Sequence, residues 1–389
     1  MTAELLLWIA LLVIGYTYLL YPAIVVILAA LYPATVRKSD AYVPTISVAI
    51  AAHNEAARIA VKVQDCLALD YPPEQLEVIV VSDGSSDDTA AILDQLHARV
   101  SDRVKVASWD RRRGKASALN VAASLATGEI LLLADTRQTL DSRVARMLAR
   151  NFADPGVGAV SGELLLLDSS ERDKPKGLGL YWRYEKVIRR AEAQLGSCIG
   201  FTGAVSAVRR NLFSSLPLDT LVDDLVIPLR VVSRGFRVVF EPMARATDQV
   251  SDVPGREFAR KVRTLGGVVQ TLIALPRWVG PLPARIWWQF MSHKILRLLV
   301  PYALAAAFVA NLMLSGRLYQ VTLAVQTSVY TLGVLGLFLP KRARRYPFLA
   351  TPATFLMLNW AAVVGPIYFL SGHRLGLWQT ALPGGTARV

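Results

Sequence analysis

The side chains best placed to do chemistry in this sequence are carboxylates and amides that directly follow short apolar segments. Three such clusters occur: Asn54 and Glu55 after residues 45–51, Asp83 after residues 77–82, and Asp135 after residues 129–134. A single Asp at such a place is often only the cap of a helix, and Asp87 or Asp88 before Thr89 fits that simpler role. Three polar clusters at the ends of separate apolar segments indicate a ligand site.

The elements that must position these clusters follow from the apolar pattern. Between about residues 40 and 260, short β-branched segments alternate with helical ones, which predicts a mostly parallel α/β sheet. The predicted strands cover 45–51, 77–82, 104–108 and 129–134. Ligands bind beyond the carboxyl ends of strands in open α/β sheets, and each acidic cluster lies at such an end.

Apolar residues make up 53% of the chain and concentrate at its two ends. No charged residue occurs from Leu5 to Tyr32, which exceeds the roughly 20 residues needed to cross a bilayer core. This stretch is too long for a signal peptide and lacks a basic region before it, so we expect a retained span. Further apolar segments near 298–315, 319–339 and 347–371 predict three more spans.

Basic residues predict the orientation of these spans. Arg37 and Lys38 follow the first span and the basic stretch 341–345 separates the last two, so both regions are expected inside. The chain would then be integral to the inner membrane of the cell. Its soluble domain would be cytosolic, and both termini would lie outside. The predicted parts are a transmembrane helix (1–36), the cytosolic domain (37–280), an interfacial amphipathic helix (281–297), and three transmembrane helices with a tail (298–389). Residues 281–297 are interpreted as interfacial because they mix tryptophan with basic residues; the alternative is an extension of the next span.

The formal net charge of +13 would suit either nucleic acid or anionic lipid as a partner. The basic residues are scattered or lie beside predicted spans, which favours membrane lipids, and we predict no nucleic-acid partner. The two cysteines, Cys66 and Cys198, have no metal-ligand spacing. We expect them to be small buried side chains in a reducing compartment.

Several motifs occur in the order typical of one enzyme family. They are the segment 46–59, Val81 to Thr89, Arg113 to Asn120, Leu133 to Asp135, Gly200 to Ala204 and Asp223 to Arg230. The chain from residue 46 to about 263 thus resembles the family 2 inverting glycosyltransferases of GT-A fold, the group of hyaluronan, chitin and cellulose synthases. The resemblance implies a Rossmann-like GT-A domain that transfers a hexose from a UDP-sugar with inversion.

The resemblance also assigns the residues that bind the nucleotide sugar. Asn54, Glu55 and Asp83 are expected to contact uracil and ribose. Lys115 would add positive charge near the diphosphate, or is simply a solvated loop cation. Arg260 or Arg263, in the segment 256–263, could reach the diphosphate and close the site.

A divalent cation, Mg²⁺ or Mn²⁺, is implied by the correspondence of Asp135 to the first carboxylate of the family's Asp-x-Asp motif. This chain has Arg137 where the second Asp would stand. Arg137 is expected either to contact phosphate itself or to point away while Asp135 alone ligates the ion. The resemblance therefore supports metal dependence less strongly, because Arg137 stands in place of the second Asp.

Catalysis is assigned to Asp224, which corresponds to the last carboxylate of the family's Thr-Glu-Asp motif and would be the general base. Asp223 would cap or support the helix that begins there, and Gly203 would let an acceptor sugar lie close to the backbone. Processive members carry Gln-x-x-Arg-Trp after the base motif, and this chain does not. Arg277-Trp278 occurs too late in the chain to count as that motif.

Three hypotheses for function remain. The first is a membrane enzyme that extends and secretes a polysaccharide, and the second is non-processive transfer to a lipid acceptor. The third is a non-catalytic nucleotide-binding scaffold or transporter, which would bind UDP without turnover. The sequence leaves open the sugar, the acceptor, whether a translocation channel forms, and the oligomeric state.

Overall fold

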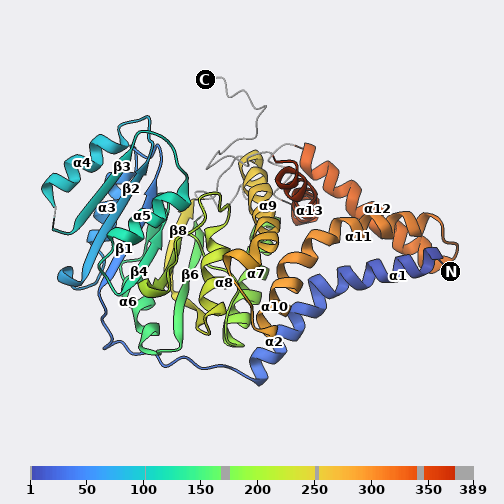
Figure 1. The fold of residues 1–389 in the computed structure, drawn as a ribbon. Helices are drawn as coiled ribbons and strands as arrows, with labels where there is room; N and C mark the ends of the chain where they lie inside the picture. Colours follow the sequence, from blue (N-terminus) through green and yellow to red (C-terminus); the bar gives the residue numbers. More distant parts are fainter. Residues whose placement is uncertain (1, 101, 168–175, 250–253, 340–345, 373–389) are drawn as a thin grey trace.

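The computed structural model describes residues 2–100, 102–167, 176–249, 254–339 and 346–372. Its soluble part is one eight-stranded mixed sheet with helices on both faces, and long apolar helices extend away from one side of it (Figure 1). The strand order is β3-β2-β1-β4-β7-β6-β8-β5. The predicted α/β fold with flanking apolar helices is confirmed.

The first half of the sheet consists of the four predicted strands. They are β1 (Ile46–Ala52), β2 (Leu76–Asp83), β3 (Val104–Trp109) and β4 (Ile130–Ala134). All neighbouring pairs among them are parallel. Every residue of β1 and β4 is buried, as expected for parallel strands covered on both faces. Their carboxyl ends therefore meet at one edge, where the predicted polar clusters lie.

The second half of the sheet is mixed rather than mostly parallel. It contains β5 (Thr139–Leu140), β6 (Val157–Leu167), β7 (Val205–Arg209) and β8 (Arg237–Gln249). Strand β7 is antiparallel to both β4 and β6, whereas β6 and β8 are parallel. Because Val205 at the start of β7 pairs with Ala134 at the end of β4, the loop before β7 lies beside the carboxyl end of β4.

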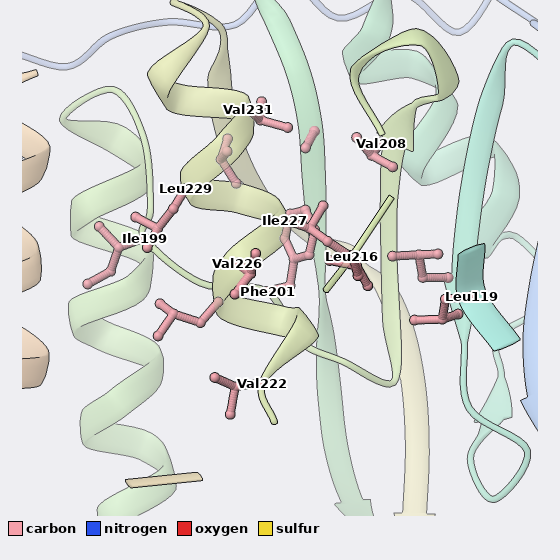
Figure 2. Close-up of a cluster of buried hydrophobic side chains, with 14 of the residues drawn as sticks. Leu119, Ile199, Phe201, Val208, Leu216, Val222, Val226, Ile227, Leu229 and Val231 are labelled. Carbon is pink, nitrogen blue, oxygen red and sulfur yellow. The ribbon is translucent and has the colours of Figure 1, made fainter. Parts of the chain in front are cut away.

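Helices bury the two faces of the sheet in separate apolar clusters. One face is covered by α3 (Ile59–Leu67), α4 (Thr89–Arg99) and α6 (Val144–Ala149), the other by α5 (Lys115–Leu125) and α8 (Asp223–Ser233). Short 3-10 turns span Pro73–Gln75, Arg150–Ala153 and Arg210–Leu212. Figure 2 shows apolar side chains of α8 gathered with Ile199, Phe201 and Leu216. This burial fixes the position of the first turn of α8.

Four helices in the described part of the chain are long and apolar enough to cross a membrane. They span Thr2–Leu31, Ala284–Leu312, Arg317–Phe338 and Pro347–Leu370. The first is built from α1 (Thr2–Gly15), a π-helical turn (Tyr16–Leu20) and α2 (Tyr21–Leu31); the last two are α12 and α13. The four predicted spans are thus found, and they indicate an integral membrane protein.

The segment predicted as a separate interfacial helix, 281–297, runs without a break into the second span. There α10 (Ala284–Phe290), a π-helical turn (Met291–Ile295) and α11 (Leu296–Leu312) form one long helix. Gln289, Phe290 and His293 on this helix are buried by protein, while Trp287 is 42% exposed. One face of the helix therefore packs against protein, where His293 contacts the carboxylates of Glu185 and Glu192.

Two further helices connect the sheet to the membrane helices. They are α7 (Lys176–Gln194) and α9 (Pro254–Trp278), both of which pack against α13. A Cβ atom on Gly365 of α13 would lie only 2.7 Å from the carbonyl oxygen of Val262 on α9. The missing side chain of Gly365 therefore allows the close approach of these two helices.

A buried ionic network joins α7 to the first and second spans. The hydroxyl of Tyr21 donates to Glu192 at 2.6 Å, and His293 Nδ1 lies 2.7 Å from the same carboxylate. His293 Nε2 lies 3.2 Å from Glu185, which also pairs with Arg297. Buried charges are tolerated only when paired in this way. The network holds the soluble domain against the spans.

Candidate active site

Three elements place charged side chains at the carboxyl edge of the sheet. Asp135 follows β4, Lys115 begins α5, and Asp223 begins α8. Lys115 Nζ lies 3.0 Å from Asp135 Oδ1 and 3.2 Å from Asp223 Oδ2. Asp135 and Asp223, 88 positions apart in the chain, thus meet at one cation. Gly114 before Lys115 has a φ of +95°, which favours glycine, and this turn aims the lysine at the edge.

Lys115 remains charged in this setting. Burial would by itself lower its pKa, but Asp135, Asp223 and Asp224 outweigh that effect and raise the pKa above its usual value. The lysine is therefore a cation that lies between the carboxylates of Asp135 and Asp223 at the carboxyl edge of the sheet.

Asp224 is held by an unusual backbone contact. Pro228 lies inside α8 and has no N–H, so the carbonyl of Asp224 receives no hydrogen bond from the residue four positions on. The backbone N–H of Phe201 donates to this carbonyl instead, at 2.8 Å. The loop before β7 is thereby tied to the first turn of α8. A Cβ on Gly203 would lie 3.8 Å from Asp224 Oδ2, so the predicted base and acceptor positions are adjacent.

The carboxylate of Asp224 has a raised pKa. Burial is the main cause and the charge of Asp223 adds to it, while Lys115, Arg263 and Lys294 act in the opposite direction. Arg263, on α9, therefore lies close enough to influence this carboxylate. Lys294, from the second span, was not among the predicted site residues. No local pattern marks it, because only tertiary packing brings the span to the sheet.

Asp83 is fully buried, and both of its oxygens accept hydrogen bonds. Trp109 Nε1 donates to it at 2.8 Å, and the backbone N–H groups of Arg113 and Gly114 donate at 2.6 and 2.8 Å. In this structure Asp83 therefore fixes the conformation of the loop that precedes Lys115. Its predicted contact with the nucleotide stays a prediction.

Asn54 and Glu55 lie in the neighbouring loop after β1. Asn54 has a φ of +55°, and its Oδ1 accepts the backbone N–H of Ser86 at 2.8 Å. The backbone N–H of Glu55 donates to Thr89 Oγ1 at 2.8 Å, and its carboxylate pairs with Arg58 at 3.4 Å. These bonds join the loops after β1 and β2 into one polar surface at the carboxyl edge.

The side chain of Arg137 forms an ion pair with Asp248 on β8. Its Nη2 donates to Asp248 Oδ2 at 2.6 Å, and Gln138 Nε2 donates to the same oxygen at 3.0 Å. In the structure Arg137 pairs with Asp248 and Asp135 pairs with Lys115. The predicted contacts of Arg137 with phosphate and of Asp135 with a metal ion stay predictions. Asp248 escaped the sequence analysis because it lies far along the chain on β8.

The remaining predicted residue, Arg260, lies on α9. Its Nη2 is 2.5 Å from Glu257 Oε2, and its guanidinium lies 5.9 Å from the ring centre of Trp182. Trp278 is remote from this group: it packs on the apolar core, and its carbonyl accepts a bond from Arg230 Nε at 2.5 Å. Arg230, on α8, therefore holds the end of α9.

The donor set of the site suits a cation that arrives with its ligand. Within the described ranges, no group of three or more His, Cys, Asp or Glu side chains could hold a metal ion. Mg²⁺ is commonly held by one or two carboxylates together with substrate phosphates. Asp135, 32% exposed at the end of β4, is a carboxylate of that kind. The residues therefore fit a cation shared between Asp135 and a diphosphate.

Comparison with known proteins gives a consistent result. The model of the glycosyl transferase family 2 matches residues 47–216. Poly-beta-1,6-N-acetyl-D-glucosamine synthase of Staphylococcus aureus (strain COL) is 26% identical over 237 residues, which cover 59% of this chain and 55% of that protein. The synthase of Staphylococcus epidermidis is 24% identical over 247 residues, covering 61% and 58%. The chain thus spans about half the length of these curated relatives.

A solved structure resembles nearly the whole chain. The mannosyltransferase PcManGT from Pyrobaculum calidifontis, in complex with GDP-Man and Mn²⁺, superposes with a TM-score of 0.73 and 24% identity. The superposition covers 94% of this chain and 99% of that one. At this identity the likeness concerns the fold, and it extends over the apolar helices as well as the sheet.

Proposed function

Since the chain carries a family 2 glycosyltransferase domain of GT-A fold, we propose that it is a membrane-bound inverting enzyme that transfers a sugar from a nucleotide sugar to an acceptor at the membrane surface. The observation that carries the proposal is the meeting of Asp135, Lys115 and Asp223 beside Asp224. This arrangement offers positive charge for a leaving diphosphate and a carboxylate for an attacking hydroxyl.

The mechanism follows from these positions. Lys115 stabilises the diphosphate as negative charge develops on it, and Arg263 adds positive charge on the acceptor side. A divalent cation held by Asp135 would supply further charge neutralisation of the departing nucleoside diphosphate. Asp224 takes the proton from the acceptor hydroxyl while that oxygen attacks the anomeric carbon. The bond to the diphosphate breaks on the opposite face, so the anomeric configuration inverts.

We propose a UDP-sugar as donor and a growing polysaccharide as acceptor, by analogy with the poly-beta-1,6-N-acetyl-D-glucosamine synthases. Transfer to a lipid is the second candidate. It is favoured by the absence of Gln-x-x-Arg-Trp and by the packing of the partly buried Trp278 against the apolar core. Four candidate spans beside the sheet are compatible with either acceptor.

We expect the purified protein in lipid nanodiscs to release nucleotide from one donor of a panel of UDP-sugars and GDP-mannose, in the presence of Mn²⁺ or Mg²⁺. Product analysis then separates the acceptors: a ladder of oligosaccharides indicates polysaccharide synthesis, and a single sugar on a polyprenyl phosphate indicates lipid transfer. Nucleotide binding without release from any donor, with both acceptors supplied, would contradict the enzyme and support a non-catalytic role.

As the pH is lowered, the rate of transfer should begin to fall at a higher pH than it would if the base were an aspartate of ordinary pKa. Asp224 must be ionised to accept a proton, and its raised pKa means that it is protonated earlier as the pH falls. The measurement is kcat/KM for the acceptor against pH, with donor affinity at each pH as the control. An acidic limb at about pH 3.9 or below, the usual range of an Asp, would contradict this.

A further inference from the structure

A buried lysine on α3 contacts the loop that carries Asp135. Lys62 is only 2% exposed, and its Nζ donates to the backbone carbonyl of Gln138 at 2.8 Å. Burying an ammonium group costs free energy unless acceptors and opposite charges lie close to it. Because its side chain is removed from solvent, Lys62 is a fixed donor to this loop rather than a surface cation.

The loop after Asp135 is also held by β8. The buried carboxylate of Asp248 accepts two hydrogen bonds at one oxygen, from Arg137 Nη2 at 2.6 Å and from Gln138 Nε2 at 3.0 Å. Gln138 is buried as well, and it contacts Lys62 through its backbone and Asp248 through its side chain. The loop is thus fixed to both α3 and β8.

The shortness of the loop carries these contacts to Asp135. Only residues 135–138 separate β4 from β5, and β5 is paired with β8. Asp135 and Gln138 are three positions apart, so at most about 11 Å of chain joins them. A change in the contacts of Gln138 therefore alters the position of Asp135.

The charge of Lys62 also reaches Asp135. Burial lowers the pKa of this lysine, whereas Cys66, Asp135 and Asp65 act in the opposite direction. The carboxylate of Asp135 thus interacts with two lysines, with Lys62 over this longer range and with Lys115 at 3.0 Å.

The composition of the loop makes the position of Asp135 important. Residues 135–138 read Asp-Thr-Arg-Gln, so Asp135 is the one carboxylate that the loop offers. A divalent cation bound by one carboxylate and a diphosphate has a single protein side chain to set its place. Displacement of Asp135 would therefore weaken the binding of the cation and of the donor together.

We propose that Lys62 and Asp248 are positioning residues for donor binding, which hold the loop so that Asp135 meets the cation and the diphosphate of the nucleotide sugar. Both act through Asp135 rather than on the reacting atoms. Groups that orient a metal ligand commonly change metal affinity or activity by about 10- to 100-fold when they are removed. The inference rests on the proposed function and extends it to two buried side chains.

The first test is Lys62→Met, which keeps an unbranched apolar side chain and removes the ammonium group. The donor KM and the Mn²⁺ concentration for half-maximal activity should each rise about tenfold, with kcat and acceptor KM within about twofold. Asp248→Asn should raise the first two constants in the same direction. Lys105→Met is the matched control: Lys105 also donates to a backbone carbonyl, that of Leu125 at 3.1 Å, but at the amino end of β3.

A double-mutant cycle separates positioning from a general loss of stability. If Lys62 acts through Asp135, Lys62→Met should change the donor KM less than about twofold in the Asp135→Asn background. The same tenfold effect in both backgrounds would overturn the proposal. So would a loss of kcat with an unchanged donor KM and an unchanged Mn²⁺ requirement.

Mn²⁺ binding in the presence of UDP, followed by electron paramagnetic resonance, tests the inference without turnover. If wild type turns over no donor, the proposed function fails by itself, and this comparison still decides the role of Lys62. Binding about tenfold weaker in Lys62→Met supports that role. Equal binding, or binding to neither protein, contradicts it. If Lys62→Met does not fold, Asp248→Asn is judged in each assay by the same criteria.

Discussion

Asp224→Asn is expected to lower kcat about 10³-fold while leaving donor affinity within a few-fold of wild type. The amide keeps the shape of the side chain but cannot take the acceptor proton, and general-base catalysis typically contributes 10²–10⁴-fold. The backbone bond from Phe201 to the carbonyl of residue 224 does not depend on this side chain. The fold of the first turn of α8 should therefore survive the change.

The measurements for this variant are nucleotide release under saturating donor and acceptor, and donor affinity by calorimetry. Asp223→Asn is the matched control, because it removes the neighbouring carboxylate and one ion pair of Lys115 at 3.2 Å. Its effect should be about tenfold, the size of one charge contact. Equal losses in the two variants would argue that position 224 has only the supporting role of its neighbour.

Asp135→Asn is expected to lower kcat/KM for the donor about 10²-fold and to flatten its dependence on Mn²⁺ or Mg²⁺ concentration. Asp135 is the carboxylate that fits a cation shared with the diphosphate, and an amide oxygen holds such a cation less well. The loss should fall mainly on donor use rather than on acceptor KM, because Gly203 and Asp224, which lie next to each other, are the residues proposed to face the acceptor.

Titration of activity with each cation, in wild type and Asp135→Asn, measures this effect. Asp70→Asn is a suitable control, since Asp70 is 53% exposed and pairs with Arg146 on the surface. A variant with full activity and unaltered cation dependence would exclude Asp135 as a ligand. In that case side chains such as Lys115 and Arg263 would have to neutralise the diphosphate, because Arg137 is engaged by Asp248.

One proline links the sequence to the geometry of the proposed base. Pro228 frees the carbonyl of Asp224 from the helix, and the N–H of Phe201 takes its place. The apolar side chains of α8 then bury the helix against Phe201 and Leu216 (Figure 2). The loop with Gly203 is thereby held at a fixed distance from Asp224. A general base needs such a fixed geometry to position the acceptor hydroxyl that it deprotonates.

The sequence by itself determined the elements and their general order. The four parallel strands, three of which are followed by polar clusters, and the four apolar spans are visible as local patterns, since period, length and charge depend on residues close together in the chain. The same patterns place Asp135 and Lys115 at strand and helix ends, and parallel pairing then makes their meeting predictable.

Only the tertiary structure decided which side chains from distant segments contact one another. The antiparallel pairing of β7 brings Gly203 to Asp224, Asp248 on β8 engages Arg137, and Trp278 packs into the core. Lys294 acts on Asp224 from a helix that local patterns do not connect with it. The physical reason is that each of these contacts depends on strand order and helix packing, which are fixed by burial summed over the whole chain rather than by any single motif.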